Sequence, residues 1–408
     1  MVDAPSRAGR YVRQPAGYRA FIPAGLPPSP PLAIDDRLFA MFGAAAEAVG
    51  RLDGAAHSLP NPQLFVAMYV RREAVLSSQI EGTQSTLDDV LRYELDEAAP
   101  DLPEDVEEVV NYVGAMYYGL RRLNDLPLSL RLIREIHAQL LSSGRGAERM
   151  PGEFRTSQNW IGPQGVPLSE AAFVPPPPHE MNEALDNLEK YLHEEPRYPA
   201  LVEAALAHAQ FETIHPFLDG NGRVGRLLVT FLLVHRKVLD EPILYLSYFL
   251  RRNRVEYYDR LMAVRERGDW EGWVAFFLRG VADTAIEATR TAKAIVDLRE
   301  AHQALVSRAG HNGLRFLDYL FQRPMINVNA VKNHLEVTFP TAATLVDLFA
   351  TEGLLQEMTG KKRNRIFRYT PYLALFREVP GGDMEQAPIA HTEGEAPEAY
   401  GAPLTVGE

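Results

Sequence analysis

The sequence has no cysteine among its 408 residues. This absence excludes disulfides and thiolate metal sites within these residues, and it fits a reducing compartment. The N-terminal stretch has no apolar core of signal-peptide length. The longest apolar run, around 227–234, is too short to cross a bilayer. We therefore expect a cytoplasmic protein with no membrane partner.

Positive charge is also in deficit, because the formal net charge is −12. This balance argues against a general affinity for nucleic acids. The deficit is concentrated near the C-terminus, where the stretch from Glu378 to Glu408 has seven acidic residues and no Lys or Arg. That stretch is rich in Gly, Ala and Pro, so we expect a disordered acidic tail over 376–408.

Helical periodicity dominates the chain after a Pro-rich start, expected to be extended, that ends near Pro31. Ser85 and Asp88 have capping-box spacing, which predicts a helix from near Ser85. The pattern predicts a mainly α protein, long enough for two or three domains with sizeable cores. The other expected helices lie at 34–52, 62–81, 105–120, 130–141, 179–193, 200–213, 222–238, 253–267 and 270–307.

The helical pattern breaks between Phe154 and Pro178. Two short strand-like pieces flank Gly162, Pro163 and Gly165, which predicts a hairpin with a wide loop. A plain surface loop is the alternative interpretation.

A second, smaller domain is expected from about 313. Three short helical segments precede strands at 355–358 and 366–369, and this order is typical of a winged helix. The turn between the strands could contact nucleic-acid phosphates, but the expected recognition helix, "TAATLVDLFATEGLL", has no Lys or Arg. We therefore favour an interaction or dimerisation module over a DNA-binding regulator. The basic residues of the turn are Lys361, Lys362, Arg363, Arg365 and Arg368.

The segment "HPFLDGNGRVGR", from His215 to Arg226, combines residue types suited to phosphate chemistry. Pro216 cannot continue the preceding helix, so His215 lies at a helix end, where it can move a proton near pH 7. The Gly-Asn-Gly run at 220–222 gives the backbone freedom to form a nest of N–H groups. Such a nest at a helix start is an anion site.

Charged side chains complete the predicted anion site. Arg223 and Arg226 are three residues apart, so they lie near one face of the helix and can hold phosphate oxygens. Asp219 offers a carboxylate suited to Mg²⁺ that bridges phosphates. Phe217 is expected to anchor the loop on the core.

These residues match, at every specified position, the signature of the Fic family, His-x-Phe-x-Asp/Glu-Gly-Asn-Gly-Arg-x-x-Arg. Over roughly 34–372 the chain resembles Fic proteins with an N-terminal inhibitory helix and a C-terminal winged helix. The resemblance implies a Fic-type helical core with a β-hairpin flap. It also implies transfer of AMP from ATP to a Ser, Thr or Tyr hydroxyl of a target protein, and it is compatible with self-modification and with a homodimer.

The resemblance also implies roles for individual residues. His215 would be the general base and Asp219 would hold Mg²⁺. The stretch "EYY" resembles the part of the family that packs on adenine, so Tyr257 or Tyr258 would contact the base. Asn159, Trp160 and Ile161 of the flap would pair with the backbone of the target. The expected ATP-binding residues in the signature are Gly220, Asn221, Gly222, Arg223, Val224, Gly225 and Arg226.

A second motif, "SSQIEG", lies upstream at 77–82. The helix over 62–81 is expected to stop at Gly82, which places Glu81 at the negative end of the helix dipole. A carboxylate there is unfavourable by about 0.3–1 kcal/mol. Ser77, Glu81 and Gly82 fit the family's inhibitory motif, Ser/Thr-x-x-x-Glu-Gly/Asn. The resemblance implies that Glu81 pairs with Arg226 and prevents productive binding of ATP.

Other activities stay open at this level. Fic-type sites also remove AMP, and some relatives transfer other nucleotides or phosphocholine. In a hydrolytic reaction Glu81 could position the water. The expected organisation is an N-terminal helical region at 1–125 with the inhibitory helix at about 62–82, a Fic core at 126–308, a winged-helix-like domain at 309–375 and the tail.

Overall fold

The structure, a computed structural model, describes residues 6–57, 62–95, 102–163, 167–361, 363–376 and 404–407. Most of these residues are helical, which confirms the expectation of a mainly α protein. No helix among the described residues is both long enough and apolar enough to cross a membrane.

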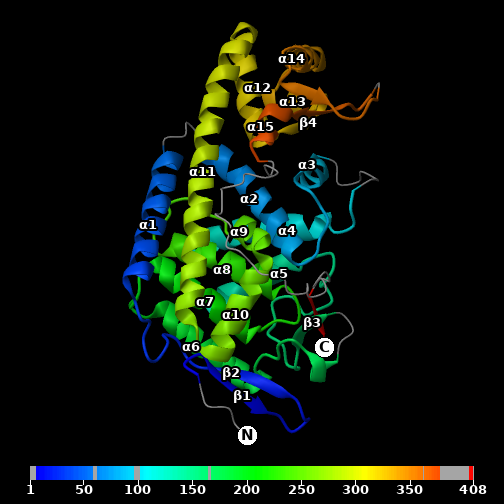
Figure 1. The fold of residues 1–408 in the computed structure, drawn as a ribbon. Coiled ribbons are helices and arrows are strands. Elements are labelled where there is room, and N and C mark those ends of the chain that lie inside the picture. The colour runs from blue at the N-terminus through cyan, green and yellow to red at the C-terminus, as the bar shows by residue number, and fades with distance from the viewer. Residues whose placement is uncertain are drawn as a thin grey trace, which may run out of the picture.

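The longest element is α11, Trp270–Val306, which runs along most of the molecule with α1, Asp36–His57, packed beside it (Figure 1). The remaining helices of the large domain surround the lower part of α11. They are α2 Pro62–Ile80, α3 Leu87–Leu95, α4 Val106–Arg122, α5 Leu130–Leu140, α6 Pro178–His193, α7 Ala200–Ile214, α8 Asn221–His235, α9 Ser247–Arg252 and α10 Arg254–Arg267.

The centre of the core is α7, whose sequence "ALVEAALAHAQFETI" has no separate polar face. A helix with no polar face must be buried all round, and every residue of α7 after Ala200 is buried. Helix α8 packs along α7, so the loop between them is fixed at both ends. This loop carries the first half of the predicted signature.

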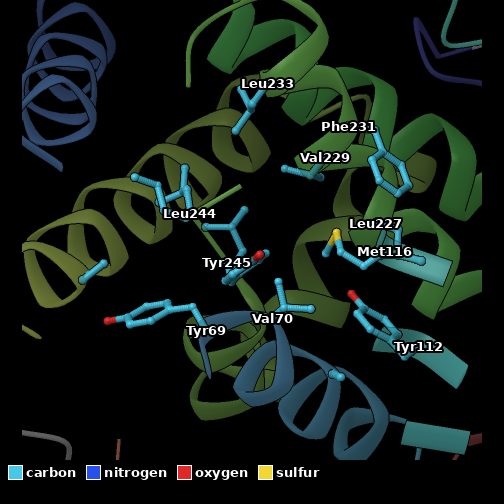
Figure 2. Packing of buried hydrophobic residues seen from close by; sticks show 14 of the residues in the cluster. Tyr69, Val70, Tyr112, Met116, Leu227, Val229, Phe231, Leu233, Leu244 and Tyr245 are labelled. Carbon is cyan, nitrogen blue, oxygen red and sulfur yellow. The ribbon is translucent and has the colours of Figure 1, made fainter. Parts of the chain in front are cut away.

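Helix α2 is part of this core. Val70 of α2 lies close to Met116 of α4 and Leu227 of α8, and all three side chains are buried (Figure 2). The helix that carries the predicted inhibitory motif is therefore held against the start of α8 by apolar packing.

The predicted flap is present as a minimal hairpin. Strand β3, Trp160–Pro163, meets the returning chain at a single bridge between Ile161 and Phe173, and the short 3₁₀ helix Leu168–Glu170 lies between them. On the other edge of β3 lies strand β7, Leu404–Gly407, in antiparallel pairing. The expectation of a disordered tail is therefore wrong for 404–407; residues 377–403 and 408 lie outside the described part of the chain.

The Pro-rich start of the chain is a β-hairpin rather than an uninterrupted extended segment. Strands β1, Gly9–Arg13, and β2, Arg19–Pro23, pair antiparallel. The Phe21 N–H donates to the Val174 carbonyl at 2.9 Å, which joins this hairpin to the returning strand of the flap.

The capping box before α3 lies one residue later than predicted. The Thr86 N–H donates to Asp89 Oδ2 at 2.8 Å, and the Asp89 N–H donates to Thr86 Oγ1 at 3.3 Å. Ser85 instead donates its hydroxyl to Asp105, at the start of α4. The Ser85–Asp88 assignment is wrong because Ser85 has this distant partner.

The smaller C-terminal domain has the expected three helices and hairpin, with one additional strand. It packs above α2 and α3 (Figure 1). The sheet order is β4-β6-β5, and every pair is antiparallel. The elements are η2 Ser307–Ala309, α12 Gly310–Gln322, β4 Met325–Asn327, α13 Val328–Leu335, α14 Phe339–Thr351, β5 Leu355–Glu357, β6 Ile366–Tyr369 and α15 Thr370–Ala374.

Candidate active site

His215 ends α7 in a left-handed conformation, with φ 50° and ψ 60°. A non-glycine residue pays about 1–3 kcal/mol for such backbone strain, so neighbouring bonds must hold it. Its N–H donates to the Phe211 carbonyl at 2.9 Å, and its carbonyl accepts from Arg155 Nε at 3.0 Å. These two bonds hold the strained turn that places His215 directly after α7.

The imidazole of His215 is buried, and neither ring nitrogen has a hydrogen-bond partner among the described residues. Burial, with Arg155 and Arg265 nearby, lowers the pKa of His215 to about 3. The ring is therefore neutral at physiological pH, and it can accept a proton from a substrate placed next to it.

The loop after His215 is closed by the side chain of Asn221. Its Oδ1 accepts from the Phe217 N–H and its Nδ2 donates to the Phe217 carbonyl, both at 2.8 Å. Gly220, at φ 75°, adopts the left-handed conformation that starts α8. The Asn221 side chain thus holds the loop, and the candidate anion-binding groups at the start of α8 are its backbone N–H groups.

His137 supports the same loop and was not identified from the sequence. Its ring stacks on Phe217 with centroids 3.7 Å apart, and its Nε2 donates to the Asp219 carbonyl at 3.1 Å. The Gly152 N–H donates to Nδ1, so His137 is the neutral tautomer with its proton on Nε2. Burial lowers the pKa of His137 to about 4, which agrees with this role.

The predicted pair between Glu81 and Arg226 is present. Arg226 Nη2 donates to Glu81 Oε1 at 2.7 Å, and its Nε donates to Ser77 Oγ at the same distance. Nη2 also donates to the Ser77 carbonyl at 3.0 Å. Gly82, at φ 100°, turns the chain directly after Glu81. Burial disfavours the charge on Arg226, but Glu81 raises its pKa above the ordinary arginine value.

Glu81 also lies on the anion site itself. A Cβ at Gly222 would collide with Glu81 Oε1, so the carboxylate rests directly on the first turn of α8. The backbone there is the nest expected to hold phosphate. The Glu81 carboxylate therefore lies where the sequence predicts an anionic ligand.

Arg223 is held by two carboxylates. Its Nη1 lies 3.3 Å from Glu108 Oε2, and its Nη2 lies 3.5 Å from Asp219 Oδ1. Glu108 belongs to the first turn of α4 and is buried, so Arg223 has a buried partner 115 residues earlier in the chain. Asp219 keeps about a third of its side chain exposed, so its carboxylate can still take a ligand.

Two of the predicted ATP contacts belong to the interior. Val224 is buried in the hydrophobic core. The Gly225 carbonyl faces His208 Nδ1 at 2.9 Å, on the side of α8 that packs on α7. The place of these two residues in the signature reflects the packing of α8 on α7. The side of the first turn that carries Gly222 is the part of α8 that faces the predicted anion site.

The two candidates for the adenine contact differ in exposure. Tyr257 is fully buried, and its hydroxyl is bonded to His208 Nε2 at 2.9 Å. Tyr257 is therefore a core residue rather than an adenine contact. Tyr258 lies at the border of the core, with Arg254 over its ring at 5.8 Å, and it remains the candidate.

The three predicted flap residues also differ in burial and in position. Asn159 is fully buried and donates from Nδ2 to the Phe217 carbonyl at 2.9 Å, so it fastens the flap to the histidine loop and does not face a target. Trp160 and Ile161 lie in β3, whose edge pairs with β7.

Arg155, also missed from the sequence, is the second fastening of the flap. Its guanidinium is buried and donates to four carbonyls, those of Ser157, Pro176, Ile214 and His215.

The fold and the site define a mainly helical protein with an anion site beside a neutral histidine. The chain matches the Fic/DOC family N-terminal model over 39–121 and the Fic/DOC family model over 127–233. It therefore carries a Fic N-terminal domain and a Fic domain.

Individual relatives support this assignment. The chain is 32% identical to the protein adenylyltransferase Fic of Aedes aegypti over 181 residues, which is 43% of this chain and 32% of that protein. It is 30% identical to the Culex quinquefasciatus protein of the same name over 181 residues, with the same coverage. The chain thus spans about a third of the length of these relatives.

A solved structure supports the fold. The chain is similar to a Fic family protein from Desulfovibrio desulfuricans G20, with a TM-score of 0.55, 23% identity and coverage of 83% of this chain and 97% of that one.

Proposed function

We propose that the chain transfers AMP from ATP to a Ser, Thr or Tyr hydroxyl of a protein. The observation that carries this proposal is the neutral imidazole of His215, which has no hydrogen-bond partner among the described residues and lies beside the predicted anion site with Arg223 and Arg226. The similarity to proteins named protein adenylyltransferase supports the choice of reaction.

The residues of the site have distinct parts in the proposed reaction. His215 takes the proton from the acceptor hydroxyl as its oxygen bonds to the α-phosphorus, and the bond to pyrophosphate breaks. General-base assistance of this kind is worth roughly 10²–10⁴-fold. The backbone at 220–222 binds phosphate oxygens, and Arg223 and Arg226 hold the phosphates that leave.

Asp219 is the residue that would hold Mg²⁺. Mg²⁺ bound with nucleotides typically takes one or two protein carboxylates and fills the other positions with phosphate oxygens and water. Asp219 fits this requirement because its carboxylate is partly exposed at the start of α8. When bound, the ion would neutralise charge on the phosphates.

The flap is the proposed docking element for the target. The edge of β3 carries an antiparallel strand, β7, with Trp160 opposite Gly407. An edge that accepts one strand can exchange it for another, so a target segment can align its hydroxyl there by backbone pairing. Because β7 belongs to the same chain, self-modification is part of the proposal.

Glu81 is proposed to inhibit the transfer. It removes Arg226 from the phosphates and covers the nest at Gly222. If the closed pairing is favoured by about 2 kcal/mol, only the open fraction binds ATP productively and apparent affinity falls roughly 30-fold. Glu81→Gly should therefore raise AMP transfer by at least about tenfold.

The test compares parent, Glu81→Gly and Glu81→Gly/His215→Ala with labelled ATP and Mg²⁺, followed by intact-mass analysis. We expect strong incorporation only in Glu81→Gly, with ATP affinity of the double variant within about threefold of it, because His215 acts in chemistry rather than binding. Transfer by the His215→Ala form would contradict the base assignment. If the protein removes AMP from a modified target and no variant adds AMP, the result would favour AMP hydrolysis over AMP transfer as the function of the chain.

The C-terminal domain is proposed to be an interaction module rather than a DNA reader. Among its basic residues, Arg368 is buried and pairs with Asp88 of α3 at 2.8 Å. Arg365 lies 3.5 Å from Asp347, and α14 has no Lys or Arg. A salt-dependent band shift with a bare duplex would contradict this choice.

A further inference from the structure

A third arginine lies at the anion site, outside the signature. Arg145 Nη2 is 3.3 Å from Glu108 Oε2, the same oxygen that Arg223 Nη1 approaches at 3.3 Å. The Arg223 side chain is 1% exposed, whereas Arg145 is 53% exposed. The Arg223 guanidinium is thus buried in the wall of the site, whereas the Arg145 guanidinium approaches the same Glu108 carboxylate from the solvent side.

The loop that carries Arg145 is shaped by the glycines on either side of it. Gly144 and Gly146 have φ angles of 75° and 89°, which favour glycine. A Cβ at Gly146 would lie 2.8 Å from Asp219 Oδ2, and one at Gly144 would lie 3.3 Å from the Glu108 side chain. The loop therefore passes close to the Asp219 carboxylate and to the Glu108 side chain.

A side chain of α4 fastens this loop. Asn111 Nδ2 donates to both the carbonyl and the hydroxyl of Ser143 at 3.1 Å. Asn111 lies one turn after Glu108, so the same helix that supplies the carboxylate also sets the position of the loop.

In the closed state, ion pairs join equal numbers of carboxylates and guanidiniums at the site. Three carboxylates, from Glu81, Glu108 and Asp219, face three guanidiniums, from Arg145, Arg223 and Arg226. A nucleoside triphosphate adds several negative charges when it displaces Glu81, and those charges need every available cation. Arg145 has donors exposed to solvent, so it can turn to the incoming phosphates without unfolding any element.

We propose that Arg145 is a further phosphate-binding residue, which holds the β- and γ-phosphates of ATP together with Arg223. The inference rests on the proposed function. It gives the loop between α5 and the flap a direct part in recognising a triphosphate. It also implies that discrimination between ATP and AMP depends on this loop as well as on the signature.

The test measures ATP and AMP binding by calorimetry in the full chain carrying Glu81→Gly. Arg145→Ala should weaken ATP binding about tenfold and leave AMP binding within about twofold, because AMP lacks the contacted phosphates. Arg145→Lys should recover part of the loss, since it keeps the charge without the bidentate geometry. Arg149→Ala, in the same loop, serves as the matched control and should change neither affinity.

Unchanged ATP binding in Arg145→Ala would overturn the inference, and so would an equal loss of ATP and AMP binding. AMP binding reports that the variant is folded. If the Glu81→Gly protein binds neither nucleotide or transfers no AMP, the proposed function fails instead, so the two failures are distinguishable.

Discussion

At the scale of single residues, the contact of Arg226 with α2, which is proposed to be inhibitory, depends on atoms that can be separated by substitution. Ser77 Oγ accepts from Arg226 Nε at 2.7 Å, whereas the adjacent Ser78 Oγ is equally buried and has no hydrogen-bond partner among the described residues. The side chains of these two neighbouring serines thus differ in their contact with Arg226.

Ser77→Ala should therefore raise AMP transfer, and Ser78→Ala should not. Removing the acceptor leaves a buried N–H of Arg226 unpaired in the closed state, at a cost of about 1–2 kcal/mol. This cost raises the open fraction, and with a closed pairing favoured by about 2 kcal/mol it raises transfer roughly five- to fifteenfold. Labelled AMP incorporation by both variants measures the difference, and an equal response of the two serines would contradict it.

The buried imidazole of His215 makes a second residue-scale prediction, on stability. Its pKa is about 3 in the folded state, below the ordinary 6.5, so the unfolded chain takes up the proton first as the pH falls. The stability that neutral His215 contributes is complete above pH 6.5 and is lost progressively towards pH 3, by at most about 1.4 kcal/mol per unit.

His215→Asn removes this titration. Between pH 6 and pH 5 the parent should lose about 1 kcal/mol more stability than the variant. Urea midpoints of both proteins at the two pH values measure the difference. The opposite order, with the variant more sensitive to acid, would contradict the burial of a neutral ring.

The signature residues could be predicted because their chemistry is local. Pro216 ends one helix and the glycines at 220 and 222 start the next, so spacing alone brings His215 beside the nest. Glu108 and Arg155 could not be predicted, because each acts on a partner 115 or 60 residues away. Tyr257 was misjudged for the same reason, since its partner His208 lies on another helix.

At the scale of elements, the position of the flap depends more on the Arg155 side chain than on backbone pairing between the two arms of the hairpin. The hairpin has a single bridge, whereas Arg155 donates to four carbonyls from both sides of its base. Sequence periodicity predicted strands here, but it could not predict that buried side chains would replace a ladder.

Arg155→Ala should thus destabilise the fold strongly. It leaves several buried carbonyls unpaired, each at a cost of about 1–3 kcal/mol, and relaxation reduces the total to about 3–5 kcal/mol. Arg131→Ala is the control, because its exposed pair with Glu135 four residues on is worth less than about 1 kcal/mol. Thermal unfolding of both variants checks the contrast, and equal melting temperatures would refute it.

At the scale of the whole molecule, the C-terminal domain packs on α2, the helix that precedes Glu81, and on α3. Glu94 of α3 accepts from Arg71 of α2 at 2.8 and 2.9 Å, and from Arg323 at the end of α12 at 2.6 Å. Tyr69 of α2 also meets Phe376 with ring centroids 5.6 Å apart. Local patterns predicted both domains but not this contact, because its residues are far apart in the chain.

Loosening this contact should weaken inhibition. Glu94→Gln keeps the size of the side chain and removes the charge that ties α2, α3 and α12 together. If the substitution destabilises the closed pairing of Glu81 with Arg226 by about 1 kcal/mol, AMP transfer rises roughly fivefold. Glu357→Gln is the matched control, because that carboxylate bonds only to nearby Thr359 and Gly360 among the described residues.

Measuring Glu94→Gln in a second chain that lacks the Glu81 carboxylate shows whether its effect on AMP transfer depends on Glu81. In a Glu81→Gly chain the closed pairing no longer exists, so adding Glu94→Gln should leave transfer unchanged within about twofold, and the two changes are not additive. A further rise in that background would mean that Glu94 acts on the catalytic site by another route. A fall in both backgrounds would mean that the contact supports folding alone, and that the C-terminal domain does not control the inhibitory helix.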